Sequence, residues 1–197
     1  MINLEKADNA DFKIYSDGSI HLDSIGAAAL LYKNRQARSL KSLQVYMGPL
    51  EKHNTYEAEA TGAILATWIL ANTPKTIGKR VLLYIDNQAL IVAISSMPKY
   101  TSGQHLIKTL RTHANDLGCK LNIRWISSHS KVKGNKEVDK IAKKAAEGRS
   151  SRLVDLPHVC RSPLPTSTSA TKQHYTITLK RRWATLWDSS PRKTRIT

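Results

Sequence analysis

The sequence predicts an α/β protein with a mixed five-stranded sheet, three strands antiparallel and then two parallel. Helices should cover both faces, and a basic helical tail should follow. Two observations support this fold class. Runs with strand and helix periodicity follow one another in the order βββαβααβα over residues 1–149. Residues 80–86 form a continuous apolar run, which is typical of a buried parallel strand. Successive strands favour an antiparallel meander, and the later helices favour parallel crossovers.

Five runs combine apolar and β-branched residues with turn signals at their ends. They are predicted as strands over residues 12–20, 26–33, 42–48, 80–86 and 120–126. The first run contains Asp17-Gly18, and Asp-Gly is also a strong hairpin signal, so local signals alone leave the role of Asp17 open. The stronger returning strand begins at Gly26. We therefore place the turn at residues 21–25 and Asp17 within or at the end of the first strand.

Four runs have helical periodicity and end at a proline or a glycine. They lie within residues 54–74, 87–98, 102–118 and 135–148. The first is the longest and most apolar, with Asn54 or Thr55 as its expected N-cap and Pro74 beyond its end. Pro98 closes the second helix and Gly118 the third.

Charge is the most informative feature of the composition. The chain has 197 residues, with 31 Lys and Arg against 15 Asp and Glu, a net charge of +16. Such an excess favours a polyanionic partner, with nucleic acid ahead of an acidic membrane surface, although charge can also serve solubility alone. No apolar run approaches the roughly 20 residues of a membrane helix, and no secretory signal is expected at the N-terminus. Cys119 and Cys160 are the only cysteines, which excludes a disulfide framework and fits an intracellular setting, nuclear or cytoplasmic.

Four acids occupy positions where a carboxylate is unexpected. Glu59 lies on an apolar stripe of the longest helix, where an ionised carboxylate needs compensation, whereas Glu57 projects from a different side. Asp86 ends the apolar strand 80–86, and the carboxyl ends of parallel strands are where ligands bind in open α/β sheets. Asp17 is the third such acid. The fourth is Asp139, which we expect in the first turn of the last helix of the domain.

Each acid also has a simpler explanation. Asp17 could turn the chain, Asp86 could cap the next helix, and Asp139 could favour its helix dipole. Together these explanations need four coincidences. Four converging carboxylates would instead form an oxygen-only site suited to Mg²⁺ or Mn²⁺. In a basic protein, such a site suits phosphodiester hydrolysis by two metal ions about 4 Å apart, one generating hydroxide and one stabilising the leaving oxygen.

Four motifs carry a resemblance to a known family: "YSDGS", "NTYEAEATGAILA", "YIDNQALI" and "WISSHSKVKGNKEVDKIAKKA". In this order and spacing they resemble type I ribonuclease H (RNase H), over about residues 12–148. The match is closest to the RNase H domains of fungal-type non-LTR retrotransposon polyproteins. The resemblance implies the RNase H-like fold and hydrolysis of the RNA strand of RNA/DNA hybrids with two divalent ions, Mg²⁺ with Mn²⁺ as a substitute. The tail resembles the segment that follows RNase H in those polyproteins, and either a fragment of a reverse transcriptase polyprotein or a degenerate copy of such an element would explain it.

The resemblance also implies roles for individual residues. Asp17, Glu59, Asp86 and Asp139 match the family's metal-binding acids, and His129 matches the mobile loop histidine that assists proton transfer or product departure. Positions that touch the RNA strand or orient the site match the following residues: Gly18, Ser19, Asn87, Gln88 and Asn135. Two positions depart from the family pattern, with Lys136 in place of Glu and Val138 in place of Ala. Neither is a metal ligand in the family.

The chain therefore divides into an RNase H-like catalytic domain (1–149), a Ser- and Pro-rich linker (150–170) and a basic helical tail (171–197). The last 48 residues hold nine Lys and Arg residues against two acids. Trp183 and Trp187 of the tail could stack on bases, dock on a partner or pack against the first domain. Two other functions stay open: a catalytically inactive module that binds nucleic acid, and a related integrase or transposase.

Overall fold

The computed structural model describes residues 9–96, 103–127 and 132–190. Its strands are β1 (Phe12–His21), β2 (Ser24–Lys33), β3 (Lys41–Pro49), β4 (Arg80–Ile85) and β5 (Lys120–Trp125). Its α-helices are α2 (Thr55–Ala71), α3 (Gln88–Ser95), α4 (Gln104–Asn115), α5 (Lys133–Ala146) and α6 (Thr168–Asp188). Short 3₁₀ helices lie at Pro74–Thr76, Leu153–Asp155 and His158–Cys160. Every strand and helix predicted within the first domain is present. Among the described residues, no helix has the length and apolar character needed to span a membrane.

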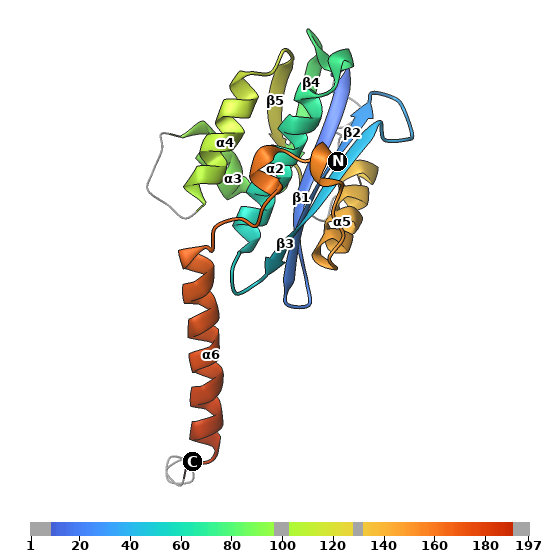
Figure 1. Cartoon of the computed structure of the whole chain (residues 1–197). Helices are drawn as coiled ribbons and strands as arrows, with labels where there is room; N and C mark the ends of the chain where they lie inside the picture. The colour runs from blue at the N-terminus through green and yellow to red at the C-terminus, as the bar shows by residue number, and fades with distance from the viewer. Residues whose placement is uncertain (1–8, 97–102, 128–131, 191–197) are drawn as a thin grey trace.

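The five strands form one mixed sheet in the order β3-β2-β1-β4-β5 (Figure 1). The pairs β1–β2 and β2–β3 are antiparallel, and the pairs β1–β4 and β4–β5 are parallel. His21 pairs with Ser24, so the first hairpin turns at Leu22 and Asp23, and Leu22 takes the positive φ of 51°. The predicted fold class and the predicted turn are both confirmed, and Asp17 lies inside β1.

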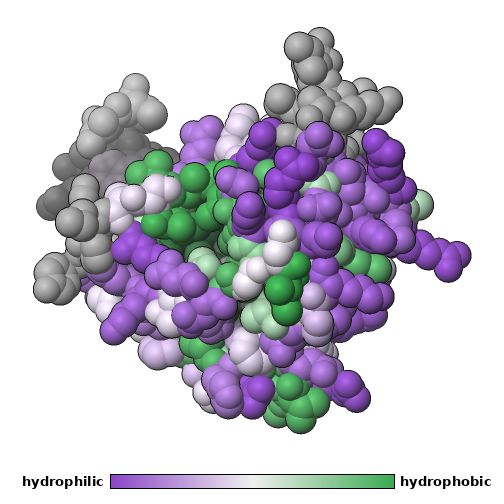
Figure 2. Space-filling model, turned by 90° about the horizontal axis from the view of Figure 1, so that it is seen from above, coloured by the Kyte–Doolittle hydropathy of each residue, from purple (hydrophilic) through white to green (hydrophobic). Residues whose placement is uncertain are grey.

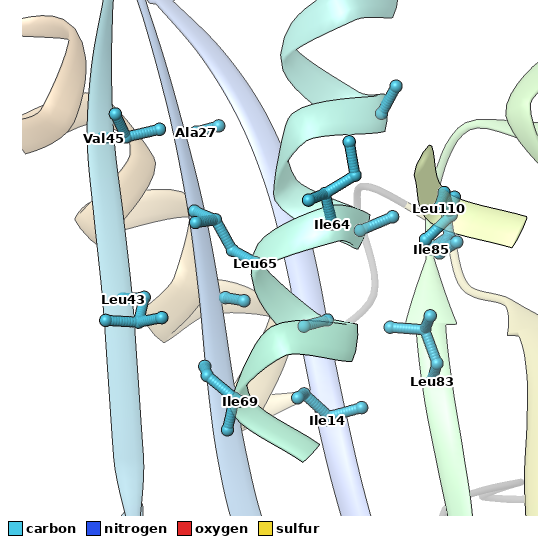
Figure 3. Packing of buried hydrophobic residues seen from close by; sticks show 14 of the residues in the cluster. Ile14, Ala27, Leu43, Val45, Ile64, Leu65, Ile69, Leu83, Ile85 and Leu110 are labelled. Atoms are coloured by element: carbon cyan, nitrogen blue, oxygen red, sulfur yellow. The ribbon is translucent and has the colours of Figure 1, made fainter. Parts of the chain in front are cut away.

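Helices pack on both faces of the sheet. On one face, α2 lies over β1 and β2, and its residues Leu65 and Ile69 point toward the strands (Figure 3). On the other face, α5 packs against β1 and β2 through Val138 and Ala142. The surface seen from above is mostly hydrophilic, with hydrophobic residues in separate patches between polar side chains (Figure 2). The apolar residues are thus buried mainly between the sheet and its helices.

Helix α2 approaches β1 unusually closely, because glycines replace side chains at the contact. A Cβ atom on Gly18 would lie only 2.5 Å from the backbone nitrogen of Glu59, and one on Gly62 would lie 2.9 Å from the Asp17 carbonyl oxygen. The family resemblance matches Gly18 to a position that touches the RNA strand. In the structure α2 occupies this space, so the small residue already has a structural reason, and an RNA contact there stays a prediction.

The segment predicted as a linker packs against the first domain. The backbone N–H of Ser151 donates to the carbonyl oxygen of Gln44 on the edge strand β3 at 2.9 Å. The indole N–H of Trp68 in α2 donates to the carbonyl oxygen of Asp155 at 2.9 Å. Leu156 is fully buried in the same core as α2. The segment has no periodic pattern of apolar residues, because a few isolated residues, and not a regular helix or strand, make these contacts. The division of the chain into three units stays a prediction.

Replacing Leu156 with Ala tests whether this segment contributes to the core. The Leu156→Ala change should lower the free energy of unfolding by about 2–5 kcal/mol, because it removes buried methyl groups and leaves a cavity. Chemical denaturation measures this value. The matched control is Leu153→Ala, whose side chain is 61% exposed and should change stability by less than about 0.5 kcal/mol. Equal, small effects of the two changes would contradict the packing described.

Candidate active site

The pairing register of the sheet sets Asp17 and Asp86 at the same level. Parallel pairing between β1 and β4 runs from Phe12 with Val81 to Tyr15 with Tyr84. Continuing the same offset by two residues brings Asp17 level with Asp86, which directly follows the last residue of β4. Because side chains alternate along strands, both acids fall on the same face as Tyr15 and Tyr84. The sequence prediction that Asp86 lies at the carboxyl end of a parallel strand is confirmed.

Helix α2 supplies the third carboxylate. Asn54 is its N-cap and accepts a hydrogen bond from the Glu57 backbone N–H at 2.9 Å, while the Glu57 carboxylate accepts from the Asn54 N–H at 3.2 Å. This capping box fixes the start of the helix. Glu57 is therefore used in capping, next to His53, and Glu59 is the acid that faces β1. The close contact at Gly18 brings the first turns of α2 onto the strand that carries Asp17.

The three carboxylates meet in one cluster. Asp17, Glu59 and Asp86 each offer an oxygen, and these oxygens lie within 4.8 Å of one another. Asp17 is 8% exposed and Glu59 5%. Among the described residues, no hydrogen-bond partner reaches Asp17 Oδ2 or Glu59 Oε2, although both atoms are buried. A buried carboxylate oxygen without a partner is costly, so a hard divalent cation, which prefers oxygen ligands, fits this cluster.

Burial and mutual repulsion raise the pKa of two of these acids. Burial is the largest cause for Asp17, and the nearby charges of Asp86 and Asp139 add to it, raising its pKa to about 7. Burial likewise dominates for Glu59, followed by the charges of Asp86 and Asp17, and its pKa rises to about 10. Glu59 is thus protonated at neutral pH when no cation is near. A bound cation would favour the ionised form and release the proton.

Asp139 approaches the cluster from α5, which packs on the face of the sheet opposite to α2 and beside Tyr15 and Tyr84. It projects from α5, is half-buried, and forms an ion pair with Lys143 one helical turn later, at 2.9 Å. Its charge acts on Asp17, but it is not one of the three acids whose oxygens lie within 4.8 Å. The expectation that Asp139 lies in the first helical turn is wrong, because α5 begins at Lys133 and Asp139 falls in its second turn. A favourable helix-dipole contact therefore does not explain this acid, since that effect decays within the first turn.

The other residues predicted for the site differ in burial and in structural role. Asn87 caps α3 by accepting a hydrogen bond from the Leu90 N–H at 3.0 Å, so the capping role weighed for Asp86 belongs to its neighbour. Ser19 and Asn135 are buried, and Gln88 is exposed. His129 lies outside the described residues.

Two neighbours of the site were not singled out in the sequence. The indole N–H of Trp125, at the end of β5, donates to the Asp86 carbonyl oxygen at 3.0 Å, although half of the Trp125 side chain is exposed. No local sequence signal distinguishes this tryptophan from an ordinary strand residue. Lys143 could have been identified from the sequence, because a lysine four residues after an aspartate on one helix is a recognisable ion-pair pattern.

Comparisons with known proteins agree with this geometry. The family model described as RNase H matches residues 9–147. No curated protein sequence matches the chain. Among solved structures, the N-terminal RNase H domain of a Mycobacterium tuberculosis protein superposes with a TM-score of 0.58 at 16% identity, covering 71% of this chain and 96% of that one.

Two further similar structures contain an RNA/DNA hybrid. LC11-RNase H1, isolated from compost by a metagenomic approach, has a TM-score of 0.58 at 15% identity, with 70% of this chain and 97% of that chain covered. The foamy viral protease-reverse transcriptase has a TM-score of 0.58 at 14% identity, with 76% of this chain and 21% of that one covered. At these identities the likeness establishes the fold. The match to the family model, which covers most of the sequence, shows that the chain belongs to the RNase H family.

Proposed function

We propose that this chain is an endonuclease that hydrolyses the RNA strand of RNA/DNA hybrids with the help of two divalent ions, Mg²⁺ or in its place Mn²⁺. The observation that carries the proposal is the cluster of Asp17, Glu59 and Asp86, in which two buried carboxylate oxygens have no hydrogen-bond partner among the described residues. A module that only binds nucleic acid has no use for such a cluster, because buried carboxylates destabilise the fold. The net charge of +16 suits a nucleic-acid backbone as substrate.

Each acid has a proposed role. Asp17 and Asp86 would position both ions, and Glu59 would hold the ion nearer the RNA 2′-hydroxyl. Asp139 would complete the site of the other ion once its ion pair with Lys143 has opened. When bound, the ions supply Lewis-acid chemistry, which makes water nucleophilic at neutral pH and stabilises charge on the leaving oxygen. Trp125 holds the Asp86 carbonyl and so fixes the chain from which that carboxylate projects.

Other residues would act on the substrate and on protons. We assign His129 to proton transfer or to departure of the product. Contacts with the RNA strand, including the 2′-hydroxyl that distinguishes RNA from DNA, are assigned to residues around the cluster. These residues are Gly18, Ser19, Asn87, Gln88 and Asn135.

We further propose that the chain derives from a reverse transcriptase polyprotein of a fungal-type non-LTR retrotransposon. The likeness to part of a viral protease-reverse transcriptase that was solved with an RNA/DNA hybrid supports a link to reverse transcription. The motifs around Asp17, Glu59, Asp86 and His129 support the narrower assignment.

Replacing Asp86 with Asn tests the catalytic role of the cluster. The Asp86→Asn enzyme should cut a uniformly labelled RNA/DNA hybrid at least ~10²-fold more slowly in Mg²⁺, because it loses an anionic ligand, while it still binds the hybrid. Duplex DNA, duplex RNA and single strands should stay intact with the wild-type enzyme. The matched control is Asp116→Asn, which removes the same charge at an exposed position outside the site. Unchanged cleavage by Asp86→Asn, or binding without Mg²⁺-dependent cleavage by the wild type, would contradict the proposal.

The raised pKa of Glu59 predicts how stability depends on pH. Between the usual pKa of 4.5 and about 10, the folded state holds a proton on Glu59 that the unfolded state releases. Stability in EDTA should therefore fall as pH rises, by up to about 1.4 kcal/mol per pH unit from this group. Asp17 contributes in the same direction, but only between 3.8 and about 7. Above neutral pH, the titration of Glu59 should therefore account for the difference in the pH dependence of stability between the wild type and Glu59→Gln.

Thermal unfolding of the wild type and Glu59→Gln at several pH values above neutral measures this effect. In EDTA the variant should be the more stable of the two, and its stability should depend less on pH. Added Mg²⁺ should stabilise the wild type more than the variant, since a ligand stabilises the state that binds it. Parallel pH profiles and equal stabilisation by Mg²⁺ would show that Glu59 is neither buried in its neutral form nor a metal ligand.

A further inference from the structure

Helix α6 projects from the rest of the molecule (Figure 1). Ala170 near its start is buried, whereas almost every residue from Thr171 to Ser189 is exposed. The exposed residues include Trp183 at 66% and Leu186 at 68%. A helix of 21 residues with several bare apolar side chains needs a reason, because packing usually stabilises such helices.

The base of α6 is fixed beside the start of α2. The Ser167 backbone N–H donates to the Lys52 carbonyl oxygen at 2.8 Å, and the Ser167 hydroxyl caps α6. The Asn54 side-chain amide donates to Ser169 Oγ at 2.8 Å. Asn54 is also the N-cap of α2, and Glu59 of the carboxylate cluster lies five residues further on. Helix α6 therefore starts beside the N-terminal end of the helix that carries Glu59, close to the site where the hybrid would be cut.

The side chains of α6 combine positive charge with aromatic and apolar surface. Along the helix, four cations stand against the single acid Asp188. The cations are Lys172, Lys180, Arg181 and Arg182. Residues at helical spacing form an aromatic and apolar stripe. The stripe consists of Tyr175, Leu179, Trp183, Leu186 and Trp187, and each of these residues is at least 40% exposed.

The position of Arg182 indicates what kind of partner covers the stripe. Arg182 follows Leu179 by three residues and Tyr175 by seven, so its guanidinium group emerges on the stripe itself. An apolar protein groove or the interior of a membrane would have to bury this charge. A second copy of the chain would bring +16 against +16. A nucleic acid offers phosphates for the cations and bases or sugars for the aromatic rings on one surface.

We propose that α6 is a nucleic-acid-binding arm that contacts the RNA/DNA hybrid outside the cleavage site. This inference rests on the proposed function, since it takes the substrate of that site as the partner. A 21-residue helix is about 32 Å long, comparable to the ~34 Å turn of a B-form duplex. The arm can therefore follow the hybrid for about a turn beyond the site and raise its affinity without touching the scissile phosphate.

Neutralising the three adjacent cations tests the arm. The variant Lys180→Gln/Arg181→Gln/Arg182→Gln keeps good helix formers, and circular dichroism checks that α6 persists. Its affinity for a labelled hybrid two turns long, measured in EDTA so that no cutting occurs, should fall about tenfold. The slope of log K against log salt should decrease by about 0.9 for each phosphate that the arm no longer neutralises. The variant Trp183→Ala/Trp187→Ala should weaken binding with little change in the salt slope, because stacking releases no counterions.

The matched control is Lys75→Gln/Lys79→Gln/Lys120→Gln, which removes the same charge from exposed positions at the opposite end of β4 and β5. This control should bind like the wild type. An α6 variant that matches the control in affinity and salt slope would overturn the proposal. Two other results would also overturn it. One is that the wild type is a dimer in ultracentrifugation and the α6 substitutions dissociate it. The other is that α6 mediates binding to anionic vesicles and not to the hybrid. Hybrid that is bound through α6 but never cut would support the arm and refute the proposed function.

Discussion

The close contact between α2 and β1 is the constraint on which the candidate site depends. Gly18 on the strand and Gly62 on the helix leave no side chain between the two backbones, and any Cβ there would collide. This contact brings Glu59 to Asp17, while the parallel register of β1 and β4 brings Asp86 to the same level. Three carboxylates from three separate elements thus meet where β4 ends. A side chain at either glycine would push the helix away from the strand and separate them.

This arrangement has an electrostatic consequence for the fold. Asp17 and Glu59 are buried beside other acids, and burial together with that repulsion raises the pKa of both. Without a cation, the cluster opposes folding as pH rises, and the apolar core between the sheet and α2 must offset the difference. Because Asp17 and Glu59 destabilise the metal-free fold in this way, the binding of a cation best explains why they are present. The same logic separates Glu59 from Glu57, whose carboxylate is satisfied within the capping box.

Much of this molecule could be predicted from its sequence. Periodicity located every strand and helix of the first domain, and the weak strand after Asp17-Gly18 correctly moved the turn to Leu22 and Asp23. Long-range packing was harder to predict. Leu156 enters the core as an isolated residue, the neighbour at Gly18 is a helix, and Trp125 reaches Asp86 from an adjacent strand. Such contacts depend on how distant segments of the chain pack together in space, and local sequence patterns do not predict that packing.

Asp17, Glu59 and Asp86 should together bind a divalent metal ion. Anomalous diffraction from crystals soaked in Mn²⁺ tests this binding most directly, because the signal locates the ion independently of any assay of cleavage. We predict an anomalous peak within coordination distance of oxygens from all three carboxylates, and its loss in Asp86→Asn crystals. Ordered crystals that show no peak at these residues in Mn²⁺, or a peak only elsewhere on the molecule, would contradict the account.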